Sequence, residues 1–281
     1  MRVLTIARLT ILEASRRKLL IALAVLTVVV VVLTSWGFSR LPTMKDVTPA
    51  EVRLAASQLT ILVAFMFSGV LALGSTLVAA PSLASDIESG IALAILPRPI
   101  RRSEVLMGKW LGLAVLVTVY AAGSGVLELL GIWWGTGYLP PNPLAALAFV
   151  ASEGIVLMTL ALLLSTRMAP MTGGVIALVL FFVAWIGGIA LAIGQTFAND
   201  TIINIGVGSR LLIPTDGLWH GAIFYLEPSD FLAAARAAGR ARAGNPFFAD
   251  QPPPVIYVAW VVAWLAGLLA LANVSFAKRD L

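Results

Sequence analysis

The sequence contains no cysteine and only one histidine, His220, among its 281 residues. Without cysteine the chain has no disulfide, no thiol nucleophile and no cysteine-ligated metal site. A single histidine argues against a histidine-rich metal or haem site. Charged residues are also scarce, at 12%, whereas 60% of the residues are hydrophobic. Because a soluble domain has about a quarter charged residues and about half apolar ones, these values indicate an integral membrane protein.

Hydrophobic runs predict six membrane-spanning helices within a single transmembrane domain, residues 1–281. A helix needs about 20 apolar residues to cross the hydrocarbon core. Suitable runs cover residues 19–36, 59–80, 110–134, 144–164, 171–197 and 255–276. Before the first run, residues 1–18 have an apolar stripe opposed by Arg2, Glu13 and Arg16. This pattern favours an interfacial helix over a cytosolic tail that happens to be helical. The predicted fold is therefore all-α.

The net charge of +5 is interpreted as a topological signal and not as a sign of nucleic-acid binding. Lys and Arg concentrate in the short cytoplasmic segments of membrane proteins. With both termini inside, the cytosolic segments hold 12 of the 19 basic residues, and four of the other seven lie in one long loop. We therefore expect a multi-pass protein of the cell membrane, the plasma or inner membrane, with N-terminus and C-terminus in the cytosol.

Residues 198–254 are expected to form an extracellular segment before the last span. Within it, residues 202–226 are apolar enough to consider as a seventh span, but they include Arg210, Asp216 and His220. Charges at the centre of a membrane helix cost a few kcal/mol each. We favour short helices that dip into or lie on the outer interface, broken at Pro214 and capped by Thr215 or Asp216. Their aromatic interface anchors would be Trp219, Phe224 and Tyr225. His220 could form a pH-sensing pair with Asp216, one turn earlier, but an isolated surface histidine near the lipid headgroups is the favoured interpretation.

The polar loop at residues 81–109 is the first candidate functional segment. An acidic pair, Asp86 and Glu88, precedes a basic elbow at 97–102 in which two prolines stiffen the chain. We expect two short helices around this corner, the second leading into the third span. The basic residues alone have a simpler interpretation, because they suit topology control and contact with anionic headgroups.

The segment SDIESGIALAILPRPIRRSEVLMGKWLG resembles the signature of ABC-2-type transporter permeases. The matching positions are Asp86, Glu88, Gly90, Pro99, Arg102, Gly108 and Lys109, whereas Ile91 replaces the usual threonine. The motif covers about a tenth of the chain, and the six-span layout resembles the family throughout. The resemblance implies that the loop forms a coupling helix docked on an ATP-binding subunit. The residues expected to take part in ATPase coupling are Asp86, Glu88, Ser89, Gly90, Pro97, Arg98, Pro99, Arg101, Arg102, Gly108 and Lys109.

No GxxxxGK[ST] phosphate-binding loop occurs in the sequence, since Lys109 is followed by Trp110. The chain itself is therefore not expected to be an enzyme or to hold a cofactor. The resemblance implies that ATP and magnesium bind the partner ATPase. It also implies a second copy of this chain or a sister permease as partner, alongside membrane lipids, with no role for nucleic acid.

Two carboxylates, Glu128 and Glu153, fall within the third and fourth predicted spans. Ionisable groups inside membrane helices are rare and often functional, so both are candidates for the transport path. Alternatively, each is protonated and bonded to a neighbouring helix, or faces a water-filled vestibule.

The favoured function is the permease subunit of an ATP-driven exporter of unidentified substrate. One alternative is an ion-coupled or proton-coupled secondary transporter that uses Glu128 and Glu153, although no inverted repeat or broken central helix supports it. A membrane-embedded enzyme has no nucleophile motif behind it. Within the first class, an ABC-type complex could instead act mechanically on an extracytoplasmic partner in maturation or assembly.

Overall fold

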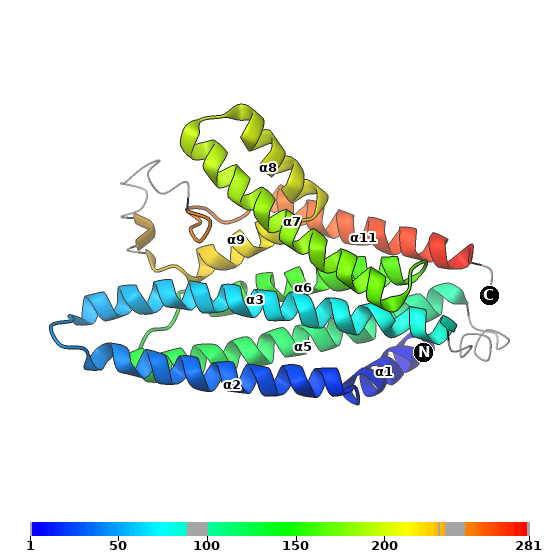
Figure 1. Cartoon of the computed structure of the whole chain (residues 1–281), viewed down its shortest axis with the longest axis horizontal. Coiled ribbons are helices and arrows are strands. Elements are labelled where there is room, and N and C mark those ends of the chain that lie inside the picture. Colours follow the sequence, from blue (N-terminus) through cyan, green and yellow to red (C-terminus); the bar gives the residue numbers. More distant parts are fainter. Residues whose placement is uncertain (1, 89–100, 230, 234–244, 280–281) are drawn as a thin grey trace.

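The computed structural model describes residues 2–88, 101–229, 231–233 and 245–279. Its regular elements are all helical within these ranges, which confirms the predicted fold class (Figure 1). In chain order they are α1 (Arg2–Ser15), α2 (Lys18–Arg40), the 3-10 helix η1 (Leu41–Thr43), α3 (Pro49–Glu88), α5 (Arg102–Thr136), α6 (Pro143–Ser165), α7 (Pro170–Phe197), α8 (Asp200–Leu212), α9 (Thr215–Leu226) and α11 (Val255–Ala277).

Six helices in the described ranges are long and apolar enough to cross a membrane, as predicted. They are α2, α3, α5, α6, α7 and α11. Several extend well beyond their apolar runs because the flanking residues also favour helix. At the start of α3, Thr48 and Glu51 form a capping box: the Glu51 carboxylate accepts the Thr48 backbone N–H at 2.8 Å, and the Thr48 hydroxyl accepts the Glu51 N–H at 3.3 Å.

Helix α1 packs along the first turns of α5 through two glycines. A Cβ at Gly108 would lie 2.6 Å from Cβ of Ile6, and one at Gly112 would lie 2.6 Å from the Ala7 carbonyl oxygen. The glycines therefore allow the two backbones to approach more closely than any side chain would permit. The buried face of α1 is formed by Ala7, Thr10 and Ala14.

Helices α8 and α9 form a hairpin that enters the bundle from the side on which α7 ends and α11 begins (Figure 1). Two contacts show its depth. The indole N–H of Trp264, nine residues into α11, donates to the Leu212 carbonyl at 2.9 Å. Gly188, nine residues before the end of α7, lies against Asp216. At 1.5 Å per residue, both place the α8–α9 turn about 14 Å inside the ends of these spans.

The burial of α9 corrects the expectation that its aromatic residues are interface anchors. Trp219 is only 2% exposed and is one of the largest fully buried side chains, and Ile223 and Ala222 are also in the core. Phe224 and Tyr225 pack against the same core. The α9 helix lies among the spans and contacts α6, α7 and α3. Pro214 separates α8 from α9, as predicted, but neither Thr215 nor Asp216 caps α9 through its side chain.

Candidate functional site

The predicted coupling residues fall into three groups. Ser89, Gly90, Pro97, Arg98 and Pro99 lie outside the described residues. Asp86 and Glu88 belong to the last turn of α3, where only the backbone is described. The remaining four residues lie in or next to the first turns of α5: Arg101, Arg102, Gly108 and Lys109.

Arg102 links the start of α5 to the end of α11. Its Nη1 donates to the carbonyl oxygens of Phe276, Ala277 and Arg279, at 3.0, 3.0 and 2.8 Å. The guanidinium carbon also lies 5.9 Å from the centre of the Phe276 ring. A helix leaves its last carbonyls without intrahelical partners and carries partial negative charge there. Arg102 therefore caps the last span, whereas the neighbouring Arg101 is exposed.

Lys109 and Gly108 connect α5 to other helices in the same region. Lys109 is only 5% exposed, and its ammonium donates to the Ser82 carbonyl of α3. Gly108 faces α1. These two residues therefore contact this chain's own helices, which places them in the framework that supports the loop.

Two further arginines, which the sequence did not single out as candidates, connect the α6–α7 turn to the end of α11. Nη1 of Arg279 donates to the Thr166 carbonyl at 2.5 Å. Arg167 donates from Nε to the Ser275 hydroxyl at 3.0 Å and from Nη2 to the Ser275 carbonyl at 3.1 Å. Together with Arg102, these side chains join three helix ends at one end of the bundle.

The two intramembrane glutamates lie in different places. Glu153 is 2% exposed and accepts a hydrogen bond from the Ser68 hydroxyl of α3 at 2.8 Å. Glu128 instead lines a cavity of about 40 Å³ together with residues of α2 and α3, including Thr27 and Phe67. Since successive residues of an α-helix are 100° apart, Ser68 and the cavity residue Phe67 project from different sides of α3. The structure therefore does not bring Glu128 and Glu153 together.

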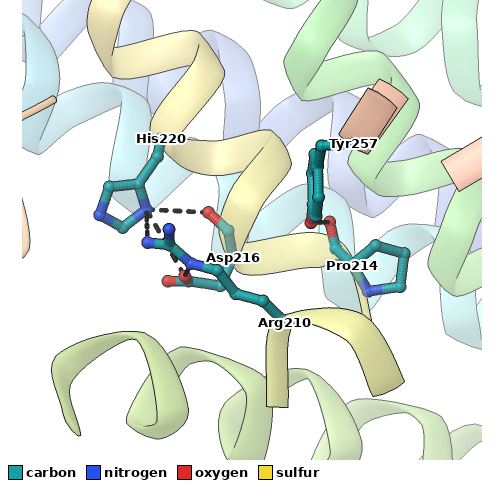
Figure 2. A network of polar contacts seen from close by, with 5 residues as sticks. All are labelled: Arg210, Pro214, Asp216, His220 and Tyr257. Carbon is teal, nitrogen blue, oxygen red and sulfur yellow. Dashed lines mark hydrogen bonds and ion pairs between the residues drawn. The ribbon is translucent and has the colours of Figure 1, made fainter. Parts of the chain in front are cut away.

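A cluster of charged side chains occupies the turn of the α8–α9 hairpin (Figure 2). Nε of Arg210 donates to Oδ2 of Asp216 at 2.5 Å, and its Nη2 lies 3.1 Å from Nδ1 of His220. The Asp216 side chain is 2% exposed and that of Arg210 is 25% exposed. Burial in low dielectric strengthens such a pair but makes either partner costly when alone. His220 is thus part of a buried network, which corrects its interpretation as an isolated surface histidine.

The contacts of His220 Nδ1 with Arg210 and with the Asp216 carbonyl belong to different protonation states of the ring. An arginine nitrogen only donates, so Nδ1 of a neutral His220 accepts from Nη2 when this hydrogen bond is made. The proton then resides on Nε2. The Asp216 carbonyl, 2.9 Å from Nδ1, becomes a partner only when Nδ1 carries a proton.

Two glycines leave room for this network. A Cβ at Gly188 of α7 would overlap the Asp216 carboxylate, and one at Gly217 would overlap the Tyr257 hydroxyl. Tyr257, in the first turn of α11, donates to the Pro214 carbonyl at 3.0 Å (Figure 2). The hairpin turn is therefore held from both α7 and α11.

The network forms part of the wall of a cavity of about 940 Å³. Its wall is formed by α7, α8, α9, residues 245–254 and the start of α11. Arg210, Gly217 and His220 contribute from the hairpin, whereas the exposed Asp200 and Asp250 lie at the end where α7 finishes and α11 begins. The volume is large enough to hold a small organic molecule.

Burial lowers the pKa of His220 below its ordinary value of 6.5; the Asp216 carboxylate opposes this shift and Arg210 adds to it. The unfolded chain therefore binds this proton more readily than the folded chain. The stabilising contribution is complete above about pH 6.5 and is lost as the pH falls. We expect the unfolding midpoint of the purified protein to decrease between about pH 6.5 and pH 5.

In His220→Asn this part of the pH dependence is expected to disappear, because the amide oxygen can accept from Arg210 near the position of Nδ1 but does not titrate. Thermal unfolding in uncharged detergent at a series of pH values measures both proteins. An identical pH profile for the variant would contradict the assignment to His220.

The comparisons with known proteins agree with this architecture. The profile of the ABC-2 family transporter protein matches residues 4–281. The probable ABC transporter permease protein NosY of Pseudomonas aeruginosa is 27% identical over 297 aligned positions, which cover 99% of this chain and 98% of that protein. The chain therefore belongs to the ABC-2 family of transporter proteins.

Proposed function

We propose that this ABC transporter permease works as the membrane subunit of an exporter whose ATP is hydrolysed on a separate chain. In this proposal, residues 81–109 are the cytosolic docking element for the ATPase, and both termini lie on the same cytosolic side. The substrate remains unassigned. Family membership supports the permease role, and the resemblance of the loop motif supports the docking role.

The contacts that best support this proposal are those of Arg102 and Lys109. Residues 89–100 connect α3 to α5, and these two side chains tie the start of α5 to α11 and to α3, respectively. A displacement of the loop by a docked ATPase would therefore move helix ends that are already joined. This arrangement provides a direct route from nucleotide-driven motion to the spans.

The proposed transport path and partners follow from the position of Glu153 and from the exposed apolar faces of the bundle. Glu153 lies at the junction of α3 and α6, within electrostatic range of Asp216. We place the transport path on this side of the bundle, and Glu128, on the other side of α3, becomes a secondary candidate. A second permease copy or sister permease would complete the pore. Exposed apolar faces on α2 and α11, with Val32 and Val262 for example, would then contact that subunit or lipid.

Glu88→Arg tests the docking proposal. The tagged chain is expressed in its native cells with a photo-crosslinking residue at position 89, and captured polypeptides are identified by mass spectrometry. We expect the parent chain to capture a protein with a phosphate-binding GxxxxGK[ST] loop and Glu88→Arg to capture it poorly, because charge reversal disrupts a polar interface.

Lys45→Glu is the matched control, since it reverses one exposed charge in the turn between α2 and α3, at the opposite end of the bundle. This variant should capture the partner as the parent does. Undiminished capture by Glu88→Arg, or capture of no nucleotide-binding chain by the parent, would argue against the docking role.

A further inference from the structure

Arg210 has hydrogen-bonding capacity that its contacts with the described residues do not use. A guanidinium carries five N–H groups. Nε bonds Asp216, and Nη2 contacts His220. Nη1 has no hydrogen bond among the described residues. Because Arg210 lines the cavity of about 940 Å³, a ligand in the cavity can reach this guanidinium.

His220 contributes to the orientation of the Arg210 guanidinium. The tautomer that accepts from Arg210 carries its proton on Nε2, which has no hydrogen-bond partner in the described part of the chain. His220 also lines the cavity. Nε2 lies on the side of the imidazole ring that faces away from Arg210 (Figure 2), so an acceptor bound by Arg210 does not reach it. His220 and Asp216 instead hold the Arg210 guanidinium in place, through the 3.1 Å and 2.5 Å contacts.

We propose that the cavity binds an amphiphilic ligand through a single oxyanion, a carboxylate or a phosphodiester, held by Arg210. A planar guanidinium with defined donor directions is well suited to such groups. The cavity wall also carries apolar side chains that can contact the remainder of the ligand, including Leu191, Ile203 and Phe248.

The surrounding charges restrict the class of ligand. The Asp216 carboxylate balances the charge of Arg210, so the site offers directed donors and little net positive charge. Asp200, exposed at the other end of the cavity, disfavours ligands with several negative charges. A monoanion or a zwitterion with an apolar part satisfies these conditions. Such a ligand comes either from solution or from the membrane, as a lipid headgroup.

That this ligand is transported cargo rests on the proposed function, but its binding does not. Binding is measured on the permease chain alone, without an ATPase. A failure of ATPase docking therefore leaves the binding result intact, and absence of binding leaves the docking proposal intact.

Isothermal titration of the full-length chain in uncharged maltoside micelles tests the site. The probes are hexanoate and dihexanoylphosphatidylglycerol, and hexanol is the matched ligand without an oxyanion. We expect saturable binding of an oxyanion probe and none of hexanol. Binding of both anions indicates a site open to soluble ligands, whereas binding of the phosphatidylglycerol alone assigns it to a lipid headgroup.

Variants separate a binding role from a structural one. Arg210→Gln is expected to weaken binding by about tenfold, the usual effect of losing a charge-assisted hydrogen bond. Asp216→Asn retains an acceptor for Nε but removes the competing negative charge, so it should bind several-fold more tightly. A purely structural role of the pair gives no such increase. Arg40→Gln, which removes an exposed charge at the end of α2, should bind like the parent.

Arg210→Lys keeps the positive charge but lacks the planar guanidinium, so it too should bind the probe more weakly. It takes the place of Arg210→Gln in the test if that variant does not fold. The proposal is overturned if no anionic probe binds saturably, or if binding is the same in the parent, the Arg210 variants and Asp216→Asn.

Discussion

Asp216→Ala is expected to lower the free energy of unfolding by about 3 kcal/mol, because it leaves the Arg210 guanidinium partly buried without its carboxylate. The ion pair is short, at 2.5 Å, and the Asp216 side chain is almost fully enclosed. Loss of the carboxylate also removes the group that fills the space beside Gly188 of α7. Both effects loosen the α8–α9 hairpin inside the bundle.

The measurement is denaturant or thermal unfolding of the purified chain in micelles, compared with two further proteins. Asp200→Ala removes an exposed acid from the first turn of α8 and should cost at most about 1 kcal/mol. The double variant Arg210→Met/Asp216→Ala should recover much of the lost stability, because neither charge is then left alone. If the double variant were as unstable as Asp216→Ala, the loss would come from packing and not from the unpaired cation.

The hairpin shows why the sequence could not fix the depth of residues 202–226. Each charge in this segment is costly in hydrocarbon when considered alone, which argued for short helices that dip into or lie on the outer interface. In the folded chain Arg210 and Asp216 neutralise each other, and Trp260 and Trp264 of α11 satisfy carbonyls at the end of α8. The two tryptophans lie about 50 residues further along the chain than the carbonyls they bind, so the hydropathy of the segment itself does not reveal them.

The six spans were predictable because each depends on its own composition. A run of about 20 apolar residues is sufficient evidence of a spanning helix, whatever its neighbours are. The ends of the helices were less predictable. The start of α5 at Arg102, for example, is followed by polar and charged residues and is stabilised by Glu104, which accepts the Arg101 backbone N–H at 2.8 Å.

Within the loop motif, the residues that match the family have different local roles. Gly108 packs on α1, Lys109 bonds α3 and Arg102 caps the end of α11. The order of residue types identified the segment, but it could not separate groups that face a partner from groups that brace the helices. That separation depends on the tertiary positions of α1, α3 and α11.

Arg102→Ala is expected to destabilise the end of α11, by about 2 kcal/mol, and to weaken the connection between α5 and the last span. One nitrogen of Arg102 serves three carbonyl oxygens, and charge-assisted bonds of this kind contribute about 1.5–3 kcal/mol in buried settings but less where water has access. The backbone amides of the last turn of α11 should therefore exchange with deuterium faster in the variant, while those near Val261 keep their protection.

Hydrogen–deuterium exchange of the intact chain, followed by mass spectrometry of its C-terminal peptides, measures this effect. Arg101→Ala removes an equal charge one residue earlier, from an exposed side chain, and should leave the exchange of α11 unchanged. Arg102→Lys keeps the positive charge near the helix end and should restore part of the protection through the helix dipole. If Arg101→Ala and Arg102→Ala increased exchange equally, the effect would be one of general charge. Arg102 would then provide no specific connection between the start of α5 and the last span, and the proposed route by which ATPase-driven motion reaches α11 would lose its support.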